Sequence, residues 1–244
     1  MIADCGDFRA DCEARIVQAS AHGLTSDKDS TMHIALIGAT GFVGSAILAE
    51  LLQRGHQVTA LARDPAKVAP QAGLTVVQAD VQQASQVAQA VKGHDAVISA
   101  YNAGWANPNL YDDFMAGSRA ITAGVKAADV PRLLVVGGAG SLYVAPGVQL
   151  VDTPEFPAQW KVGATAARDA LKLLQAEQDL AWTFVSPPVM LHPGERTGTF
   201  RLGGDDVLMT DKGPAEISTP DLAVAIVNEI EQPQHLRRRF TAGY

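Results

Sequence analysis

The sequence predicts an α/β fold in which one doubly wound parallel sheet is covered by helices on both faces. Short apolar runs alternate with helix-favouring segments along most of the chain, as parallel strands joined by crossover helices require. The runs are apolar enough for strands buried on both faces. Glycine or polar residues follow each run, where ligands bind in such sheets. We expect a single domain, with a small C-terminal cap after Pro187.

The expected elements follow from these runs and from local start and stop signals. The predicted strands cover residues 33–37, 57–62, 74–78, 95–100, 133–136, 181–185 and 239–241. The predicted helices cover residues 42–54, 84–91, 110–128 and 163–178, and a further segment that begins at Ser218 or Thr219.

Each boundary in the first half has a residue that explains it. The first strand, 33–37, runs directly into glycines that open the first helix, and Gly55 ends that helix as a left-handed C-cap. After the second strand, Asp64 can cap a short helix whose first turn suits Pro65. Gly93 ends the next helix, and loop 101–108 leads from the fourth strand into the long helix at 110.

The second half has weaker boundaries. A glycine run follows the fifth strand, and 141–159 reads as a loop rich in proline and glycine. The helix predicted at 163–178 has a helical-period apolar face: Ala167, Ala170, Leu171 and Leu174. Ser186-Pro187-Pro188 breaks the sixth strand, and Pro220-Asp221 is typical of a helix start.

Residues 1–31 differ from the rest, because they are polar and mixed in charge and Met32 immediately precedes the first strand. We therefore predict two parts: a loosely attached extension, 1–31, and a nucleotide-binding domain, 32–244. A regulatory or dimer-forming arm is the alternative for the extension.

Composition excludes several classes of protein. The chain has 244 residues, of which 47% are hydrophobic and 18% charged, so it is globular rather than disordered. Its net charge of −7 is unsuited to general nucleic-acid binding. The dense basic run Arg237-Arg238-Arg239 is predicted to be the solvent-exposed start of a strand near the C-terminus.

Targeting and metal signals are missing. Cys5 and Cys12 both precede the glycine turn, with no metal-ligand spacing, so neither a disulfide nor a metal site is expected. No apolar run approaches the roughly 20 residues of a membrane helix, and no secretion signal is evident. The cytoplasm is therefore the predicted location.

The most informative stretch is the turn Gly38-x-x-Gly41-x-x-Gly44, between the first strand and the first helix. Gly38 permits a tight turn, Gly41 permits close approach of a phosphate, and Gly44 permits tight helix–strand packing. The helix N-terminus offers free N–H groups and a positive dipole end. This context favours a dinucleotide site, and an ordinary structural turn is the alternative.

Residues after the second and third strands suggest which nucleotide binds. A carboxylate at the end of the second strand would favour NAD, but Arg63 follows that strand here, and a guanidinium suits the 2′-phosphate of NADP(H). Asp64 is the competing residue, and a surface role is the alternative for Arg63. Asp80 could accept from the adenine amino group while Val81 packs on the ring. NADP(H) is therefore preferred over NAD(H).

These motifs resemble a known family. The glycine turn, Arg63-Asp64-Pro65 and Asp80-Val81 are similar to the atypical short-chain dehydrogenase/reductase superfamily. The later segments 184–188, 193–198 and 217–223 are similar to NAD(P)H-binding proteins called NADH-flavin reductases, relatives of biliverdin-IXβ reductase. The resemblance covers 32–244. It implies a Rossmann-type monomer or homodimer that binds NADP(H) and reduces flavins, quinones or similar planar acceptors.

The superfamily's usual proton-transfer motif, Tyr-x-x-x-Lys with a serine, is incomplete. Lys161 is a candidate lysine just before the predicted helix, but Pro157 stands four positions earlier instead of tyrosine. Ser141, Tyr143 and His192 are weak candidates for the missing proton-transfer groups. An ordinary loop role is the alternative for each.

The remaining expectations concern contacts. The expected cofactor contacts are Gly38, Thr40, Gly41, Phe42, Val43, Gly44, Arg63, Asp80, Val81, Ser99, Ala100, Tyr101, Gly138, Lys161 and Pro187. Loop aromatics could stack on a planar acceptor or simply pack on the domain: Tyr101, Trp105, Tyr143, Phe156 and Trp160.

Two functions remain open from the sequence. The first is an NADPH-dependent oxidoreductase that passes hydride to a flavin, quinone or similar planar acceptor without Tyr-x-x-x-Lys. The second is a non-catalytic NADP(H)-sensing protein that acts through a protein partner. A sugar-nucleotide epimerase or dehydratase is disfavoured, because that chemistry needs the tyrosine and little chain remains for a substrate domain.

Overall fold

The computed structural model describes residues 31–244, and an eight-stranded sheet forms their centre. The strand order is β10-β14-β8-β5-β4-β1-β2-β3, and all neighbours are parallel except β10 and β14. The order reverses between β1 and β4, which is the doubly wound pattern. The predicted fold class is confirmed. The proposed extension 1–31 lies, except for Thr31, outside the described residues.

Except for β10, which no predicted strand covers, the strands of the sheet follow the apolar runs closely. They are β1 His33–Ile37, β2 Gln57–Ala62, β3 Leu74–Gln78, β4 Ala96–Ser99, β5 Arg132–Val136, β8 Ala181–Val185, β10 Arg201–Gly203 and β14 Arg238–Gly243. The helices are α1 Phe42–Gln53, α2 Ala84–Val91, α3 Leu110–Ala127, α4 Ala158–Gln175 and α5 Thr219–Glu231, with short 3₁₀ turns η1 Pro65–Lys67, η2 Ala139–Ser141 and η3 Leu150–Asp152.

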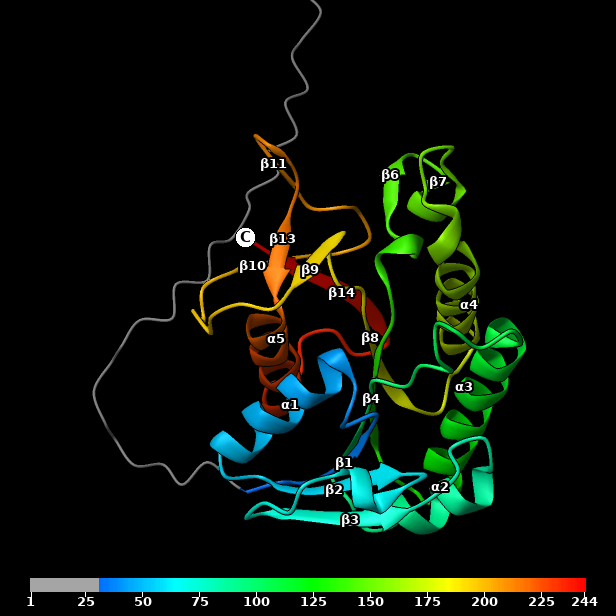
Figure 1. Cartoon of the computed structure of the whole chain (residues 1–244), viewed down its shortest axis with the longest axis vertical. Helices are drawn as coiled ribbons and strands as arrows, with labels where there is room; N and C mark the ends of the chain where they lie inside the picture. Colours follow the sequence, from blue (N-terminus) through cyan, green and yellow to red (C-terminus); the bar gives the residue numbers. More distant parts are fainter. Residues whose placement is uncertain (1–30) are drawn as a thin grey trace, which may run out of the picture.

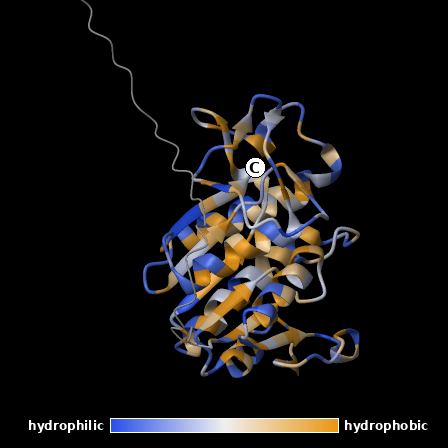
Figure 2. Cartoon of the chain, turned by 90° about the vertical axis from the view of Figure 1, so that its left-hand side faces the viewer, coloured by the Kyte–Doolittle hydropathy of each residue, from blue (hydrophilic) through white to orange (hydrophobic). Residues whose placement is uncertain are grey.

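The helices form one layer on each face of the sheet (Figure 1). α1 and α5 cover one face, and α2, α3 and α4 cover the other. Alternate residues of β1 divide between the two cores: Ile34 and Leu36 face α1 and α5, while Ala35 and Ile37 face the other layer. Hydrophobic residues run along the strands and covering helices, and hydrophilic residues concentrate in the loops (Figure 2).

Local signals explain several boundaries. Gly55 lies beyond the end of α1 with a φ of 83°, and Gly93 follows α2 with a φ of 81°, so both take the left-handed conformation that glycine tolerates. Asp64 accepts from the Ala66 amide at 3.2 Å and caps η1. Ser218 caps α5 through the Asp221 amide at 3.2 Å. These predicted caps are confirmed.

The helix predicted at 163–178 begins earlier, at Ala158. Pro157 is its N-cap, and Gly163 is tolerated inside it because Trp105 packs where a Cβ would stand. Lys161 therefore lies within the first turns of α4, not before the helix. The predicted apolar face of 167–174 is confirmed as buried.

The segment predicted as a loop at 141–159 contains a hairpin, β6 Tyr143–Ala145 and β7 Val148–Gln149. Its strands pair antiparallel around Pro146-Gly147, and Gly147 has a φ of 75°. Proline followed by glycine is typical of a type II turn. Pro146-Gly147 is therefore the sequence feature from which this hairpin could have been predicted.

The cap after Pro187 also contains short strands that the sequence did not predict. They are β9 Met190–His192, β11 Met209–Thr210, β12 Gly213–Pro214 and β13 Glu216–Ser218. β9 pairs with β13, and β11 with β12, above the carboxyl ends of the main strands (Figure 1). The final strand, predicted at 239–241, extends over the whole of β14.

Candidate functional site

The glycine turn lies where the strand order reverses. β1 is paired with β2 on one side and with β4 on the other, and the Ala100 amide donates to the Ile37 carbonyl at 2.9 Å. The crevice beyond these strand ends is the usual ligand position in an open α/β sheet. The candidate pyrophosphate turn therefore stands at the position that the fold class favours.

Two of the three glycines are sterically required. Gly38 has a φ of 84°, and a Cβ on it would collide with the Ala100 carbonyl. A Cβ on Gly44 would collide with the Gly38 carbonyl, so α1 can approach β1 closely only with glycine here. Gly41 is less crowded, and its amide closes the turn on the Gly38 carbonyl at 2.9 Å.

The N-terminus of α1 is open. Gly41 is the N-cap, so no side chain caps the helix, and its first turn contains no acidic residue. The first helical amide to find a carbonyl is that of Ser45, which donates to Gly41 at 2.9 Å. The amides of Phe42, Val43 and Gly44 therefore remain available for a phosphate group. Thr40 is exposed beside them, and Phe42 is 55% exposed.

Arg63 stands beyond β2 as an exposed cation. Among residues 31–244, its guanidinium has no hydrogen bond and no ion pair, whereas Asp64 is occupied with η1 and lies 3.8 Å from Lys67. Asp64 is thus directed toward η1, as its expected capping role predicts. Arg63 is therefore free to meet an anionic ligand.

Asp80 and Tyr101 border the same end of the crevice, beyond β3 and β4. Asp80 accepts from the Gln82 amide at 3.0 Å, and Val81 is buried behind it. Burial raises the pKa of the Tyr101 phenol, while a Gln82 hydrogen bond and the charge of Arg63 oppose that increase. The Tyr101 hydroxyl donates to the Asp113 carbonyl at 3.0 Å, so this ring is fixed against α3.

The other end of the crevice lies beyond β4, β5 and β8. Ser99 is buried, Gly138 follows β5 beside Ala167, and Pro187 is buried directly after β8. The Ser186 hydroxyl is fully buried and has no hydrogen-bond partner within residues 31–244. Small residues and an unpaired polar atom fit a planar amide such as nicotinamide.

The four weak catalytic candidates are dispersed. Ser141 is buried on η2, Tyr143 is half-buried on β6, Lys161 is exposed on α4, and His192 lies on β9. The Ser141 hydroxyl accepts from Arg239 at 3.0 Å, and His192 Nδ1 lies 2.8 Å from the Pro193 carbonyl. No hydrogen bond joins any two of these four side chains, all of which are described.

The aromatic candidates are also divided. Trp105 and Trp160 form an edge-to-face pair with ring centroids 4.8 Å apart, between the loop after β4 and the start of α4. Tyr101 packs on Phe114 at 5.7 Å. Tyr143 alone among the five aromatics lines the large cavity that follows.

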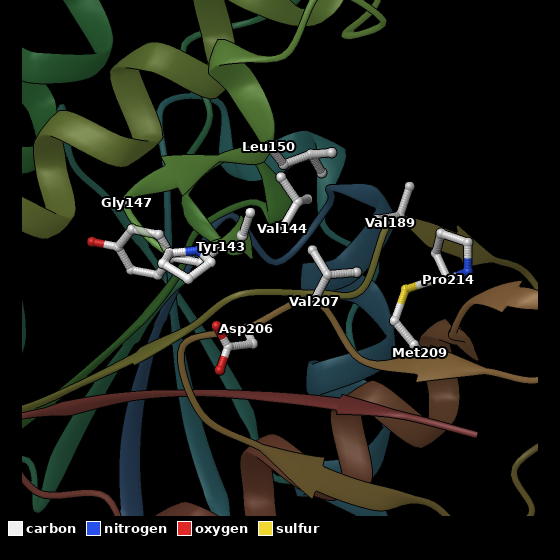
Figure 3. Close-up of a pocket in the computed structure, with 11 residues that line it drawn as sticks. Tyr143, Val144, Gly147, Leu150, Val189, Asp206, Val207, Met209 and Pro214 are labelled. Carbon is white, nitrogen blue, oxygen red and sulfur yellow. The ribbon is translucent and has the colours of Figure 1, made fainter.

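An open cavity of about 640 Å³ lies between the β6–β7 hairpin and the C-terminal cap (Figure 3). Val144 and Leu150 face Val207 and Met209 across it. Its other lining residues are Tyr143, Ala145, Pro146, Gly147, Val189, Asp206 and Pro214. The hairpin follows β5 and Val189 follows β8 in the chain, so the cavity, like the glycine turn, lies beyond the carboxyl ends of parallel strands.

Arg239 corrects the prediction of a fully solvated arginine run. Its side chain is only 3% exposed, pairs with Asp205 at 2.6 Å and donates to the Ser141 carbonyl at 2.7 Å. Sequence alone missed this contact, because Asp205 lies far from Arg239 in the chain. The pair fixes β14 against η2 and the wall of the cavity.

Asp221 is a second residue that sequence reasoning treated only as a helix signal. It is fully buried and accepts from the Thr197 and Gly198 amides, both at 2.8 Å, and from the Tyr244 hydroxyl at 2.8 Å. It therefore holds the 193–198 segment and the chain's final residue against α5.

Comparison with known proteins decides the family. A family model described as NAD(P)H-binding matches residues 38–233, which is most of the chain. The chain belongs to this NAD(P)H-binding family. The resemblance to atypical short-chain dehydrogenases/reductases is thereby confirmed, and the dinucleotide turn has its expected context.

Individual relatives of this NAD(P)H-binding protein carry different names. It is 40% identical over 213 residues to the uncharacterized protein YwnB of Bacillus subtilis, covering 86% of this chain and 97% of YwnB. It is 44% identical to a proposed epimerase from Bacteroides thetaiotaomicron, with a TM-score of 0.81, covering 88% of this chain and 97% of that one. It is 35% identical to a proposed NADH-flavin reductase from Streptococcus pneumoniae, with a TM-score of 0.78, covering 87% and 99% of the two chains.

The part of this NAD(P)H-binding protein that is described, 31–244, contains no helix with the length and apolar character needed to cross a membrane. The same residues contain no group of three or more His, Cys, Asp or Glu side chains placed to hold a metal ion.

Proposed function

We propose that the protein is an NADPH-dependent reductase that passes hydride to a planar ring acceptor such as a flavin or a quinone. One observation carries the proposal: an uncapped helix N-terminus suited to a phosphate and an apolar cavity of about 640 Å³ both follow the carboxyl ends of the parallel strands. That volume lies within the range of small-molecule sites. The name of the Streptococcus pneumoniae relative points to the same class of reaction.

The residues that would hold NADPH follow the strand ends. The amides of Phe42, Val43 and Gly44 would bind the pyrophosphate, and Arg63 would bind the 2′-phosphate by charge-assisted hydrogen bonds. Asp80 would accept from the adenine amino group. The opposite end of the cofactor would then lie beside Ser99, Gly138 and Pro187; Ala100 and Lys161 are further proposed contacts.

Bound NADPH supplies a hydride, and the chain's task is mainly orientation and exclusion of water. A quinone or flavin that receives hydride gains two electrons and one hydrogen, then takes one proton from water, while NADP⁺ is left. This chemistry needs no Tyr-x-x-x-Lys. Such a reaction needs no side chain that donates a proton to the acceptor. This agrees with the separation of the four candidates, Ser141, Tyr143, Lys161 and His192, from one another.

A direct assay tests the proposal. The purified protein is mixed with NADPH and with riboflavin, FMN or a small quinone, and NADPH absorbance is followed. We expect oxidation well above the uncatalysed rate with at least one ring acceptor. Tight NADPH binding without oxidation by any of them would overturn the reductase proposal.

That negative result would favour the second candidate, an NADP(H)-sensing protein that acts through a protein partner. The same incomplete proton-transfer motif is the observation that supports it. The name of the Bacteroides thetaiotaomicron relative raises epimerase chemistry. We do not extend that chemistry to this chain, because no tyrosine stands four positions before Lys161.

A further inference from the structure

We infer that the cavity selects an uncharged, phosphate-free ring as its occupant. Two features decide this selectivity: the negative charge of Asp206, and the lack of any lysine, arginine or histidine among the described residues that line the cavity. The inference rests on the proposed function and deepens it, because it separates riboflavin or a quinone from phosphorylated flavins.

The lining is apolar at the end formed by Val189, Met209 and Pro214 (Figure 3). Met209 is 55% exposed and Val189 is 38% exposed, so apolar surface there lacks a partner in the described chain. Burial of such surface by a ring is favourable in proportion to the area covered. The cavity therefore suits an apolar planar molecule.

The opposite end of the cavity is acidic. Asp206 stands beside Tyr143, and its carboxylate has no hydrogen bond or ion pair within residues 31–244 (Figure 3). Its backbone neighbours fix it there, because the Tyr143 amide donates to the Asp205 carbonyl and the Val207 amide donates to the Tyr143 carbonyl, both at 2.9 Å. Asp206 is exposed, and an anionic substituent bound at this end of the cavity would lie near its negative charge.

No lysine, arginine or histidine is among the residues that line the cavity, all of which are described. The Arg239 guanidinium lies 5.9 Å from the Tyr143 ring centroid, but Asp205 already neutralises it. Arg201 donates to the carbonyl oxygens of Met209 and Tyr244, and so is held behind the cavity wall. A phosphate group would therefore be repelled by Asp206 and would gain no cationic partner.

Flavin fluorescence measures this selectivity without turnover. Riboflavin and FMN are titrated separately with the protein in the presence of saturating NADP⁺, which cannot reduce them. We expect riboflavin to bind about fivefold more tightly than FMN, as a repulsion of about 1 kcal/mol gives. Menadione is then added to the riboflavin complex to test whether a quinone binds at the same site as a flavin. Release of riboflavin by menadione shows that a quinone occupies the same cavity.

Charge variants identify the cause. Met209→Lys places a cation in the lining and should tighten FMN about fivefold, with little change for riboflavin. Asp206→Asn should narrow the difference between the two flavins. Leu236→Lys is the matched control, because Leu236 is 49% exposed and does not line the cavity. This substitution changes the net charge of the protein by the same amount as Met209→Lys. Thermal unfolding of each variant checks that it is folded.

The outcomes separate this inference from the proposed function. Equal binding of both flavins, equal responses to Met209→Lys and Leu236→Lys, or no binding of any ring would overturn the selectivity. Oxidation of NADPH by FMN at the riboflavin rate would overturn it while leaving the reductase proposal intact. Selective riboflavin binding without NADPH oxidation by any acceptor would support the selectivity and contradict the reductase.

Discussion

Arg63 is the residue on which the proposed preference for NADPH over NADH depends. It is exposed beyond β2 and unpaired among the described residues, and the neighbouring carboxylate of Asp64 already caps η1. A paired charge-assisted contact to a phosphate contributes roughly 1.5–3 kcal/mol. A contact between Arg63 and the 2′-phosphate would therefore be strong enough to discriminate NADPH from NADH.

Replacement of Arg63 by alanine should weaken NADPH binding by about tenfold to a hundredfold, because the 2′-phosphate loses its cationic partner. NADH affinity should change by less than about twofold. Calorimetric titration with both nucleotides measures the two effects. Lys67→Ala, which removes a neighbouring exposed cation, is the control. Equal losses for both nucleotides would show that Arg63 does not bind the 2′-phosphate.

Gly44 is a second residue with a specific consequence. A Cβ there would strike the Gly38 carbonyl, so Gly44→Ala must displace α1 from β1. We expect a loss of NADPH affinity of at least about tenfold and a destabilisation of about 1–3 kcal/mol, typical of overpacking. Chemical denaturation and nucleotide titration measure both quantities.

The control for Gly44 is Gly204→Ala, because a Cβ on Gly204 would meet no atom within 4 Å. It should change stability by less than about 0.5 kcal/mol. If both alanine variants bind NADPH equally well, close helix–strand approach is not needed at the turn.

At the scale of elements, a buried ionic network ties α5 to the amino ends of β5 and β8. Glu229 of α5 lies 2.9 Å from Arg132 and 2.8 Å from His235 Nδ1, and its side chain is only 3% exposed. Burial alone would raise the pKa of Glu229, but hydrogen bonds from His235 and from the Gln234 and His235 amides lower it below its ordinary value.

This network makes stability depend on pH. A carboxyl group whose pKa is lower in the folded state stabilises the protein above its unfolded pKa, near 4.5, and that contribution is lost as pH falls through the folded pKa. Glu229→Gln should cost about 3 kcal/mol near pH 7, since Arg132 is left buried without its partner. The difference between the two proteins should shrink below about pH 4.5.

Urea denaturation at pH 7 and near pH 4 measures this difference. Lys172→Ala, which breaks a more exposed pair with Asp169, should cost less than about 1 kcal/mol. A Glu229→Gln effect that is constant over this pH range would contradict the assigned ionisation of Glu229.

At the scale of the whole molecule, the sequence predicted the parallel sheet well, because its strands are apolar runs ended by glycine or polar residues. β1, β2, β3 and β8 match their predicted bounds, β4 is one residue shorter at each end, and β5 begins one residue earlier. The turn residues Gly38 and Gly44 were also identifiable, since their role follows from local geometry.

The cap was much less predictable. Its strands are short, so they have too few residues for a periodic pattern, and they pair with segments distant in the chain. The burial of Arg239 and the contacts of Asp221 depend on partners that only the fold brings close. The lining of the cavity, assembled from β6, β7 and the cap, was beyond sequence reasoning for the same reason.

We propose that hydride passes from NADPH, bound at the glycine turn, to a ring acceptor in the cavity between the β6–β7 hairpin and the C-terminal cap. Stopped-flow oxidation of NADPH deuterated separately on each face of the nicotinamide C4 tests it most directly. We expect slower acceptor reduction with one deuterated stereoisomer and an unchanged rate with the other, because the bound ring presents one face to the cavity. Equal rates with both, at the uncatalysed level, would contradict hydride transfer in this site.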